Sequence, residues 1–201
     1  LWDPFCGSGT IAIEAALMMT NVAPGISRKF ICEEFALLSN GRIAREERSK
    51  AYAAINHNSD FEVCASDIDE EVLKIAQANA ERAGVDDRIR FFISDARDIK
   101  KLDRRGTIVC NPPYGERLMS EREVEYLYRD MGRAFSELSP WQIYILTSAE
   151  NFERLYGRRA DKTRKLYNGM IPCSLYQYFK PADAKFGTER KQFDKPYLKK
   201  K

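Results

Sequence analysis

Apolar and polar positions alternate along the chain with two different periods. Short apolar runs, typical of buried strands, are separated by longer stretches in which apolar residues return every three or four positions, as on one face of a helix. The predicted strands are a remnant at 1–4 and the runs 61–66, 89–93, 106–110, 141–147, 162–167 and 171–179. The predicted helices cover about 9–20, 42–55, 70–83, 121–138 and 150–156.

This order of elements predicts the fold class. Strands that alternate with helices imply a mostly parallel sheet with helices on both faces. The last two strands are joined at Asn168-Gly169, a pair typical of the turn of a tight hairpin. We therefore predict an α/β fold, with a doubly wound, mostly parallel, seven-stranded sheet and an antiparallel C-terminal hairpin. The first strand is expected to be truncated, and an upstream portion would then contain most of it.

Length and composition add few constraints. The 201 residues are long enough for one large domain, predicted at 1–184, and the aperiodic basic segment 185–201 is predicted to be disordered. Five cysteines without a Cys-x-x-Cys pair are expected to be buried thiols in a reducing compartment. His57 is the only histidine and is read as a surface residue, and no metal site is expected. No apolar run is long enough to span a membrane, so we expect a soluble, cytoplasmic protein.

A glycine loop, Asp3-Pro4-Phe5-Cys6-Gly7-Ser8-Gly9-Thr10, precedes the first predicted helix. Gly7 and Gly9 allow the backbone to approach a ligand, and the start of the helix presents free N–H groups. The loop lacks the Lys-Ser/Thr ending of a P-loop, and Ile13 stands where a dinucleotide fingerprint has its last glycine. Nucleoside triphosphates and NAD are therefore disfavoured as ligands.

Acidic residues follow the next two predicted strands. Asp67, after the strand 61–66, is placed to hold a ribose through its hydroxyls, whereas Asp69 is expected to cap the following helix, although either could bind the ribose. Asp95, after the strand 89–93, could accept a hydrogen bond from an adenine amino group. Taken singly, such residues are more often simple turn residues.

The stretch Asn111-Pro112-Pro113-Tyr114 follows the strand 106–110 and suits a planar exocyclic amine. Two consecutive prolines cannot donate backbone hydrogen bonds, so the Asn111 side-chain oxygen and a proline carbonyl can stand as rigid acceptors. The Tyr114 ring offers a flat face on which an unstacked base can lie. The alternative interpretation is a strand that ends in a proline-rich turn.

Taken in order, these motifs resemble those of the S-adenosylmethionine-dependent class I methyltransferases. They are Asp-Pro-Phe-Cys-Gly-Ser-Gly-Thr, Ser-Asp-Ile-Asp, Ser-Asp-Ala and Asn-Pro-Pro-Tyr-Gly-Glu-Arg-Leu. Within that class the chain is similar to the guanine-N2 RNA methyltransferases whose complete chains carry an upstream THUMP domain, especially the bacterial enzyme that acts on large-subunit ribosomal RNA. The similarity covers nearly the whole chain, including the segment 164–169.

The resemblance implies S-adenosyl-L-methionine as the cofactor and RNA as the partner. It implies that the methionine part of the cofactor is held by Asp3, Cys6, Gly7, Gly9 and Thr10. The ribose would be held by Asp67 and Ile68, and the adenine by Asp95 and Ala96. Asn111 would lie beside the cofactor. The target amine would be received by Asn111, Pro112, Pro113 and Tyr114.

Basic residues near the end of the chain are the candidate RNA contacts. The net charge is only +3, but Arg158, Arg159, Arg164 and Lys165 belong to a local cluster that could follow a phosphate backbone. Arg117, close behind the proline pair, is a further candidate. The alternative is an ordinary solvated surface. Three functional hypotheses result: guanine-N2 methylation of RNA, adenine-N6 methylation of DNA or RNA, and a non-catalytic RNA-binding remnant.

Overall fold

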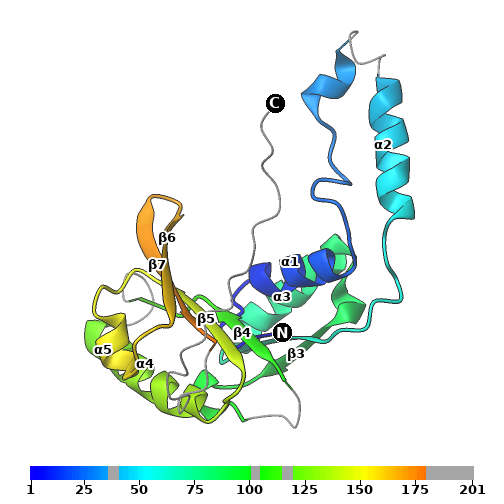
Figure 1. The fold of residues 1–201 in the computed structure, drawn as a ribbon. Coiled ribbons are helices and arrows are strands. Elements are labelled where there is room, and N and C mark those ends of the chain that lie inside the picture. Colours follow the sequence, from blue (N-terminus) through cyan, green and yellow to red (C-terminus); the bar gives the residue numbers. More distant parts are fainter. Residues whose placement is uncertain (36–40, 101–104, 115–119, 180–201) are drawn as a thin grey trace, which may run out of the picture.

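The computed structural model describes residues 1–35, 41–100, 105–114 and 120–179. The strands in these residues form one sheet (Figure 1). Within these residues seven strands lie in the order β3-β2-β1-β4-β5-β7-β6. They are β1 (Trp2–Asp3), β2 (Val63–Asp67), β3 (Ile89–Ile93), β4 (Thr107–Cys110), β5 (Gln142–Thr147), β6 (Lys162–Asn168) and β7 (Ile171–Tyr178). The predicted fold class is confirmed.

The short strand β1 lies at the centre of the sheet. Trp2 pairs with Cys64 of β2 on one side and with Ile108 of β4 on the other, both in parallel register. From β1 the chain moves outward to β2 and β3, and then returns across β1 to β4 and β5. The strand order therefore reverses beside β1, and such a switch point is where open α/β sheets bind ligands.

The sheet is completed by the predicted antiparallel hairpin, although its turn differs by one residue from the prediction. β7 runs antiparallel to β5 and to β6, and Asn168 pairs with Ile171 across the end of the hairpin. The two turn residues are therefore Gly169 and Met170, and not Asn168 and Gly169. Gly169 has a φ of 62°, the sign that the first central residue of a primed hairpin turn requires. Asn168 is thus a strand residue.

Helices cover both faces of the sheet (Figure 1). On one face lie α1 (Thr10–Met19) and α3 (Glu70–Ala83), and on the other lie α4 (Glu121–Ser136) and the short α5 (Phe152–Tyr156). The Ser120 side chain and the Glu123 side chain cap the start of α4 reciprocally, as the sequence predicts. Short 3-10 helices were not predicted. They are η1 (Ile31–Glu34), η3 (Asp86–Arg88) and η4 (Ala96–Asp98).

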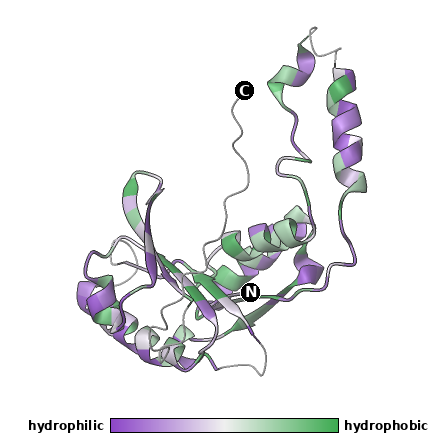
Figure 2. Ribbon diagram, in the orientation of Figure 1, coloured by the Kyte–Doolittle hydropathy of each residue, from purple (hydrophilic) through white to green (hydrophobic). Residues whose placement is uncertain are grey.

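Residues 21–35 and 41–56 form an arm that stands away from the sheet and contains η1 and α2 (Arg42–Ala53) (Figure 1). No residue of α2 is buried, and Figure 2 shows hydrophobic and hydrophilic residues on the arm in alternation. The two ends of the arm meet beside α1, where the Asn56 amide donates to the Thr20 carbonyl at 2.8 Å and the Asn21 side chain donates to the Ala54 carbonyl at 2.9 Å.

Several further expectations bear on the whole chain. The predicted boundary between 184 and 185 lies outside the described residues. Four of the five cysteines are buried, and Cys32 is exposed. None of the described helices is both long enough and apolar enough to cross a membrane.

Candidate active site

The carboxyl ends of four neighbouring parallel strands bring the predicted motifs to one edge of the sheet. β1 ends at Asp3, β2 at Asp67, β3 at Ile93 and β4 at Cys110. A backbone hydrogen bond connects the ends of β2 and β3, where the Ser94 amide donates to the Asp67 carbonyl at 3.0 Å. The glycine loop, the two acidic motifs and the proline pair therefore follow adjacent strands.

The glycine loop folds against the end of β2. The Cys6 amide donates to the Ser66 carbonyl at 3.0 Å, and the Gly9 amide donates to the Cys6 carbonyl at 2.8 Å. The Gly7 amide donates to Asp67 Oδ2 at 3.0 Å. A carboxylate on one strand thus fixes the shape of the loop that follows another. Gly7 has a φ of 51°, and the space that a Cβ would take there is open, so a ligand can approach the backbone at this point.

Two aspartates at the end of β2 have separate roles. Asp69 Oδ1 accepts from the amides of Glu71 and Val72, which confirms that Asp69 caps α3. Asp67 accepts from Gly7 through Oδ2 and from the Asp69 amide through Oδ1, at 3.2 Å. A carboxylate oxygen can accept more than one hydrogen bond, so Asp67 can still receive ligand hydroxyls while it holds the loop. Ile68, between the two, is exposed.

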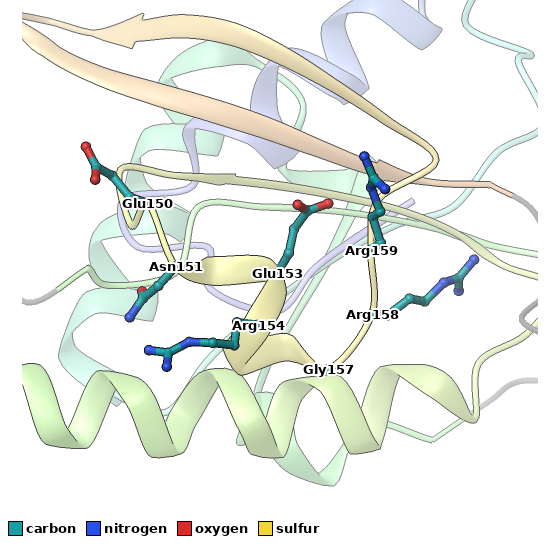
Figure 3. A pocket seen from close by; sticks show the side chains of 7 residues that line it. All are labelled: Glu150, Asn151, Glu153, Arg154, Gly157, Arg158 and Arg159. Atoms are coloured by element: carbon teal, nitrogen blue, oxygen red, sulfur yellow. The ribbon is translucent and has the colours of Figure 1, made fainter.

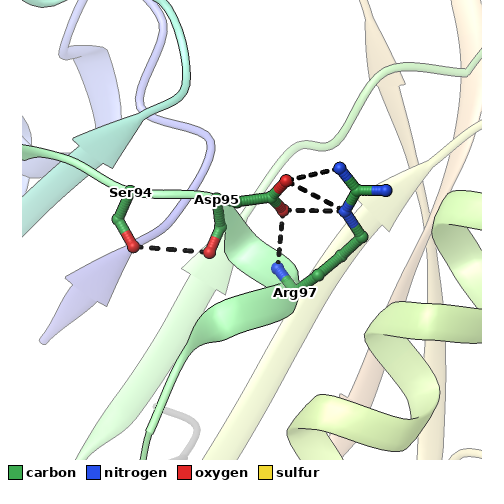
Figure 4. A network of polar contacts seen from close by, with 3 residues as sticks. All are labelled: Ser94, Asp95 and Arg97. Carbon is green, nitrogen blue, oxygen red and sulfur yellow. Dashed lines mark hydrogen bonds and ion pairs between the residues drawn. The ribbon is translucent and has the colours of Figure 1, made fainter.

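Asp95 is held by a neighbour that sequence reasoning did not include. Its carboxylate receives hydrogen bonds from the Arg97 amide and from the Arg97 guanidinium, as Figure 4 shows. The hydrogen bond and charge of Arg97 lower the pKa of Asp95. Any adenine amino group would share this carboxylate with Arg97. Ala96, buried beside it, begins η4. The signal in the sequence was the Asp-x-Arg spacing, which permits an ion pair around a tight turn.

Asp3 is a buried carboxyl at the centre of the site. Its Oδ1 accepts from the Phe5 amide at 3.1 Å. Burial raises the pKa of Asp3 to about 7, and the nearby charge of Asp67 adds to this effect. Burial likewise raises the pKa of the Cys6 thiol to about 12, so that this thiol is protonated at neutral pH. Thr10, the remaining residue predicted at this loop, is exposed and begins α1.

The structure leaves two buried side-chain oxygens without a hydrogen-bond partner among the residues it describes, and both lie at this edge. They are Asp3 Oδ2 and Asn111 Oδ1. Buried polar atoms are rarely left unpaired, so each needs an explanation. Asp3 ends β1 and Asn111 directly follows β4, and these two strands are neighbours. Each oxygen is an acceptor that a bound ligand can satisfy.

A buried tyrosine forms a hydrogen bond with the proline pair. The Tyr128 hydroxyl donates to the Pro113 carbonyl at 2.9 Å and contacts Thr147 Oγ1 at 2.8 Å. Burial raises the pKa of Tyr128 to about 12. Tyr128 thus occupies one lone pair of the Pro113 carbonyl, and the Pro112 carbonyl is the other candidate acceptor. Sequence reasoning missed Tyr128, because nothing in the pattern of α4 distinguishes it from an ordinary core residue.

Tyr114 is partly exposed and is attached to the C-terminal hairpin. The Asn168 side chain donates to the Tyr114 hydroxyl at 2.9 Å, although the two residues are 54 positions apart. Sequence reasoning treated Asn168 as part of a hairpin turn and of the segment 164–169 that resembles the family, and assigned it no contact with Tyr114. This bond joins the segment after β4 to the end of β6.

The predicted RNA contacts lie in different places. Arg158 and Arg159 line a surface pocket together with the acidic Glu150 and Glu153 (Figure 3), and Arg158 also lies 3.6 Å from Asp161. The positive charge of Arg158 is thus partly balanced by Asp161. Arg164 and Lys165 are exposed on β6, the strand that ends at Asn168. Arg117 lies outside the described residues.

Comparison with known proteins gives the family. Residues 1–177 match the model of a protein family described as UPF0020, RMKL-like, methyltransferase domain. The chain is 47% identical over 182 residues to the putative RNA methyltransferase YpsC of Bacillus subtilis, covering 88% of this chain and 46% of that protein. It is 36% identical over 177 residues to the ribosomal RNA large subunit methyltransferase K/L of Legionella pneumophila, covering 88% of this chain and 25% of that protein. The chain thus spans about half of the first relative and a quarter of the second.

Solved structures agree with this match. A putative methyltransferase, SMU.472, complexed with SAH, superposes with a TM-score of 0.84 at 38% identity, over 89% of this chain and 47% of that one. A predicted N6-adenine-specific DNA methylase from Listeria monocytogenes superposes with a TM-score of 0.81 at 42% identity, over 90% of this chain and 46% of that one. The predicted resemblance to class I methyltransferases is confirmed. The chain belongs to the family of RMKL-like methyltransferase domains, whose cofactor is S-adenosyl-L-methionine.

Proposed function

We propose that this domain transfers a methyl group to the exocyclic N2 amine of a guanine in RNA, with large-subunit ribosomal RNA as the target. The family supports methyl transfer, and the name of the Legionella pneumophila relative supports ribosomal RNA. The observation that carries the proposal is the buried, unpartnered Asn111 Oδ1, in the residue that directly precedes the proline pair. An exocyclic amine has two N–H donors, and Asn111 Oδ1 and the Pro112 carbonyl are two acceptors held rigidly by consecutive prolines.

The residues of the glycine-loop side fit the cofactor. Gly7 leaves open space for the methionine part, and the unpartnered Asp3 Oδ2 is a buried acceptor for its amino group. Asp67 is assigned to the ribose hydroxyls and Asp95, with Ala96, to the adenine. When bound, the cofactor supplies an electrophilic methyl group on its sulfonium. Cys6 stays a neutral thiol at physiological pH because burial raises its pKa, so it adds no negative charge and serves as packing.

The proline pair prepares the amine for reaction. The lone pair of an exocyclic amine is delocalised into the ring, and hydrogen bonds from both N–H groups to Asn111 and Pro112 favour a pyramidal nitrogen as the new bond forms. Asn111 and Pro112 would hold this nitrogen for the methyl group that the bound cofactor would supply, and the nitrogen would then release one proton to water. Positioning supplies most of the acceleration, and no dedicated base is required.

The target guanine must be unpaired or flipped out of a helix, since its amine is otherwise inaccessible to the proline pair. Tyr114 is partly exposed and supplies the stacking face. Arg164 and Lys165 are assigned to the phosphate backbone, because they are exposed on the strand that reaches the site.

A second candidate is methylation of adenine N6. The Listeria monocytogenes structure described as a predicted N6-adenine-specific DNA methylase favours it. The acceptors at Asn111 and Pro112 fit any exocyclic amino group, and adenine N6 is one. The two functions differ in the methylated nucleoside, which mass spectrometry of digested nucleic acid identifies. Label in N6-methyladenosine and none in N2-methylguanosine would contradict the proposal.

The central test is Asn111→Ala. Without the acceptor, transfer of labelled methyl groups to unmodified ribosomal RNA should fall by about a hundredfold or more, as for other preorganised polar groups in active sites. The affinity for S-adenosylmethionine, measured by calorimetry, should stay within about twofold, because Asn111 is assigned mainly to the target amine. Asn58→Ala, on an exposed loop, is the matched control. Equal losses of cofactor affinity and transfer would contradict the role of Asn111.

A further inference from the structure

We propose that the tip of the β6–β7 hairpin, residues 167–170, forms a wall of the base-binding site, and that Asn168 holds the Tyr114 ring in the orientation that stacks on the target base. Asn168 is then a positioning residue, and the tip is a docking surface for unpaired bases of the RNA. This inference rests on the proposed function.

The position of the hairpin supports this assignment. The pairing of β5 with β7 ends at Thr147 and Ser174, whereas β7 begins at Ile171. The hairpin therefore continues about 10 Å beyond the carboxyl end of β5, at about 3.4 Å per residue. Figure 1 shows the hairpin rising above the sheet at this edge. Its tip reaches the segment that follows β4, where Asn168 donates a hydrogen bond to Tyr114.

Tyr114 is fixed at two points. Its main chain follows Pro113, whose carbonyl is held by the Tyr128 hydroxyl at 2.9 Å. Its own hydroxyl is held by Asn168 Nδ2 at 2.9 Å. A tyrosine ring fixed by the backbone alone still rotates about its side-chain bonds, and a hydrogen bond at the far end restricts that rotation. The bond to Asn168 thus sets the plane on which a base can stack.

The turn geometry makes this contact available. Because the turn residues are Gly169 and Met170, Asn168 stays in the strand, paired with Ile171. A one-residue shift of the turn would move the side chain of position 168 away from its present direction, since side chains alternate along a strand. Gly169, with its positive φ, permits the observed turn.

Two exposed apolar side chains belong to the hairpin tip, Tyr167 on the face of β6 opposite to Asn168 and Met170 in the turn. Tyr167 is 75% exposed and Met170 is 94% exposed. Large apolar side chains at a polar edge often mark a binding surface, and unpaired bases stack on such groups. The exposed Arg164 and Lys165 precede them on β6. Cationic and aromatic groups along one strand are the combination that single-stranded nucleic acids bind.

The experiment is a double-mutant cycle with Asn168→Ala, Tyr114→Phe and the double variant, in the full chain with saturating S-adenosylmethionine and unmodified ribosomal RNA. Each substitution deletes the same hydrogen bond, so each should lower kcat by about three- to tenfold, the effect of one neutral hydrogen bond. The double variant should be no slower than the slower single variant. KM for the RNA and the melting temperature should change little.

Matched controls separate positioning from general damage. Thr163→Ala lies on the same strand, about 17 Å from Asn168, and should transfer methyl groups at the normal rate. Tyr167→Ser with Met170→Ser should weaken binding of a fluorescent single-stranded RNA oligonucleotide by about fivefold or more, because stacking surface is lost.

Two results would overturn the inference while leaving the proposed function intact: normal kcat in Asn168→Ala, or single effects that multiply in the double variant. Unchanged RNA binding after the double serine substitution would remove the docking surface. Failure of the proposed function has a different signature, because the wild-type chain would then place no label in N2-methylguanosine. The same double-mutant cycle, with kcat measured for the base that is labelled, would still give the coupling of Asn168 to Tyr114.

Discussion

The two faces of the sheet are packed with side chains of very different size. The α1 and α3 face is rich in small residues, and its fully buried members include Ala12, Ala16, Ala65, Ala76 and Ala80. The α4 and α5 face is packed with aromatic rings, which include Tyr128, Phe135, Phe152, Tyr156, Tyr176 and Tyr178. The first face supports the glycine loop and the second supports the proline pair.

The difference in size corresponds to a difference in how each half of the site is built. Small residues allow close approach of the backbone, since a Cβ on Gly9 would lie 3.1 Å from the Ala76 Cβ. The glycine-loop side therefore binds through main-chain groups and two aspartates. On the aromatic face, the Tyr128 ring packs in the core while its hydroxyl reaches the Pro113 carbonyl. On the substrate side, the Tyr128 side chain thus holds the proline pair in place.

The largest predicted effect is on the glycine-loop side, where Asp3 makes the unfolding free energy depend on pH. Its pKa, raised from 3.8 to about 7 by burial, means that the folded state binds its proton more tightly than the unfolded state does. The stability from this group is present below about pH 4 and is lost as the pH rises to about 7. At roughly 1.4 kcal/mol per pKa unit, the loss is on the order of 4 kcal/mol.

Asp3→Asn should therefore flatten the fall in unfolding free energy between about pH 4 and pH 7, measured by urea denaturation without cofactor. Asp60→Asn, at an exposed carboxyl, serves as the control and should keep the wild-type slope. If Asp3→Asn and the wild type had parallel pH profiles, the buried carboxyl would not be the source of this pH dependence.

The second predicted effect is a loss of stability when the packing of the α4 and α5 face is disturbed at Gly132. A Cβ on Gly132 of α4 would lie 2.0 Å from the Tyr156 carbonyl oxygen, so α4 and α5 would have to separate. Overpacking of this kind costs about 3 kcal/mol at the upper end of its usual range. Gly132→Ala should lower the unfolding free energy by about that amount in guanidinium denaturation, whereas the neighbouring exposed Arg133→Ala should change it by less than about 0.5 kcal/mol. A fully stable Gly132→Ala would contradict the tight packing.

The smallest predicted effect comes from removing the hydroxyl oxygen of Tyr128, which separates the two sides of the site. Tyr128→Phe keeps the ring but deletes the hydrogen bonds to Pro113 and Thr147, and should cost about 1–2 kcal/mol of stability because buried acceptors lose their partner. Methyl transfer should fall with it, while cofactor affinity stays normal. Equal loss on both sides of the site would show that the two faces are not independent supports.

Sequence patterns predicted most of the sheet, because strand and helix periods and the terminal motifs are local signals. The cap at Asp69 and the capping box at Ser120 are local in the same sense and were also predicted. The contacts of Asn168 with Tyr114 and of Tyr128 with Pro113 join separate elements, and neither has a local signature. The one-residue shift of the hairpin turn shows the same limit, because strand pairing decided which residues turned.

The arm is attached to the body of the protein at two neighbouring points. Its two ends are held together by hydrogen bonds at Thr20 and Asn21, next to where α1 finishes, and α2 buries no residue. The chain thus leaves the body of the protein and re-enters it at nearly the same point. Such an insertion behaves as a cassette, since its length and composition can change during evolution without disturbing the register of the strands or the spacing of the motifs at their ends.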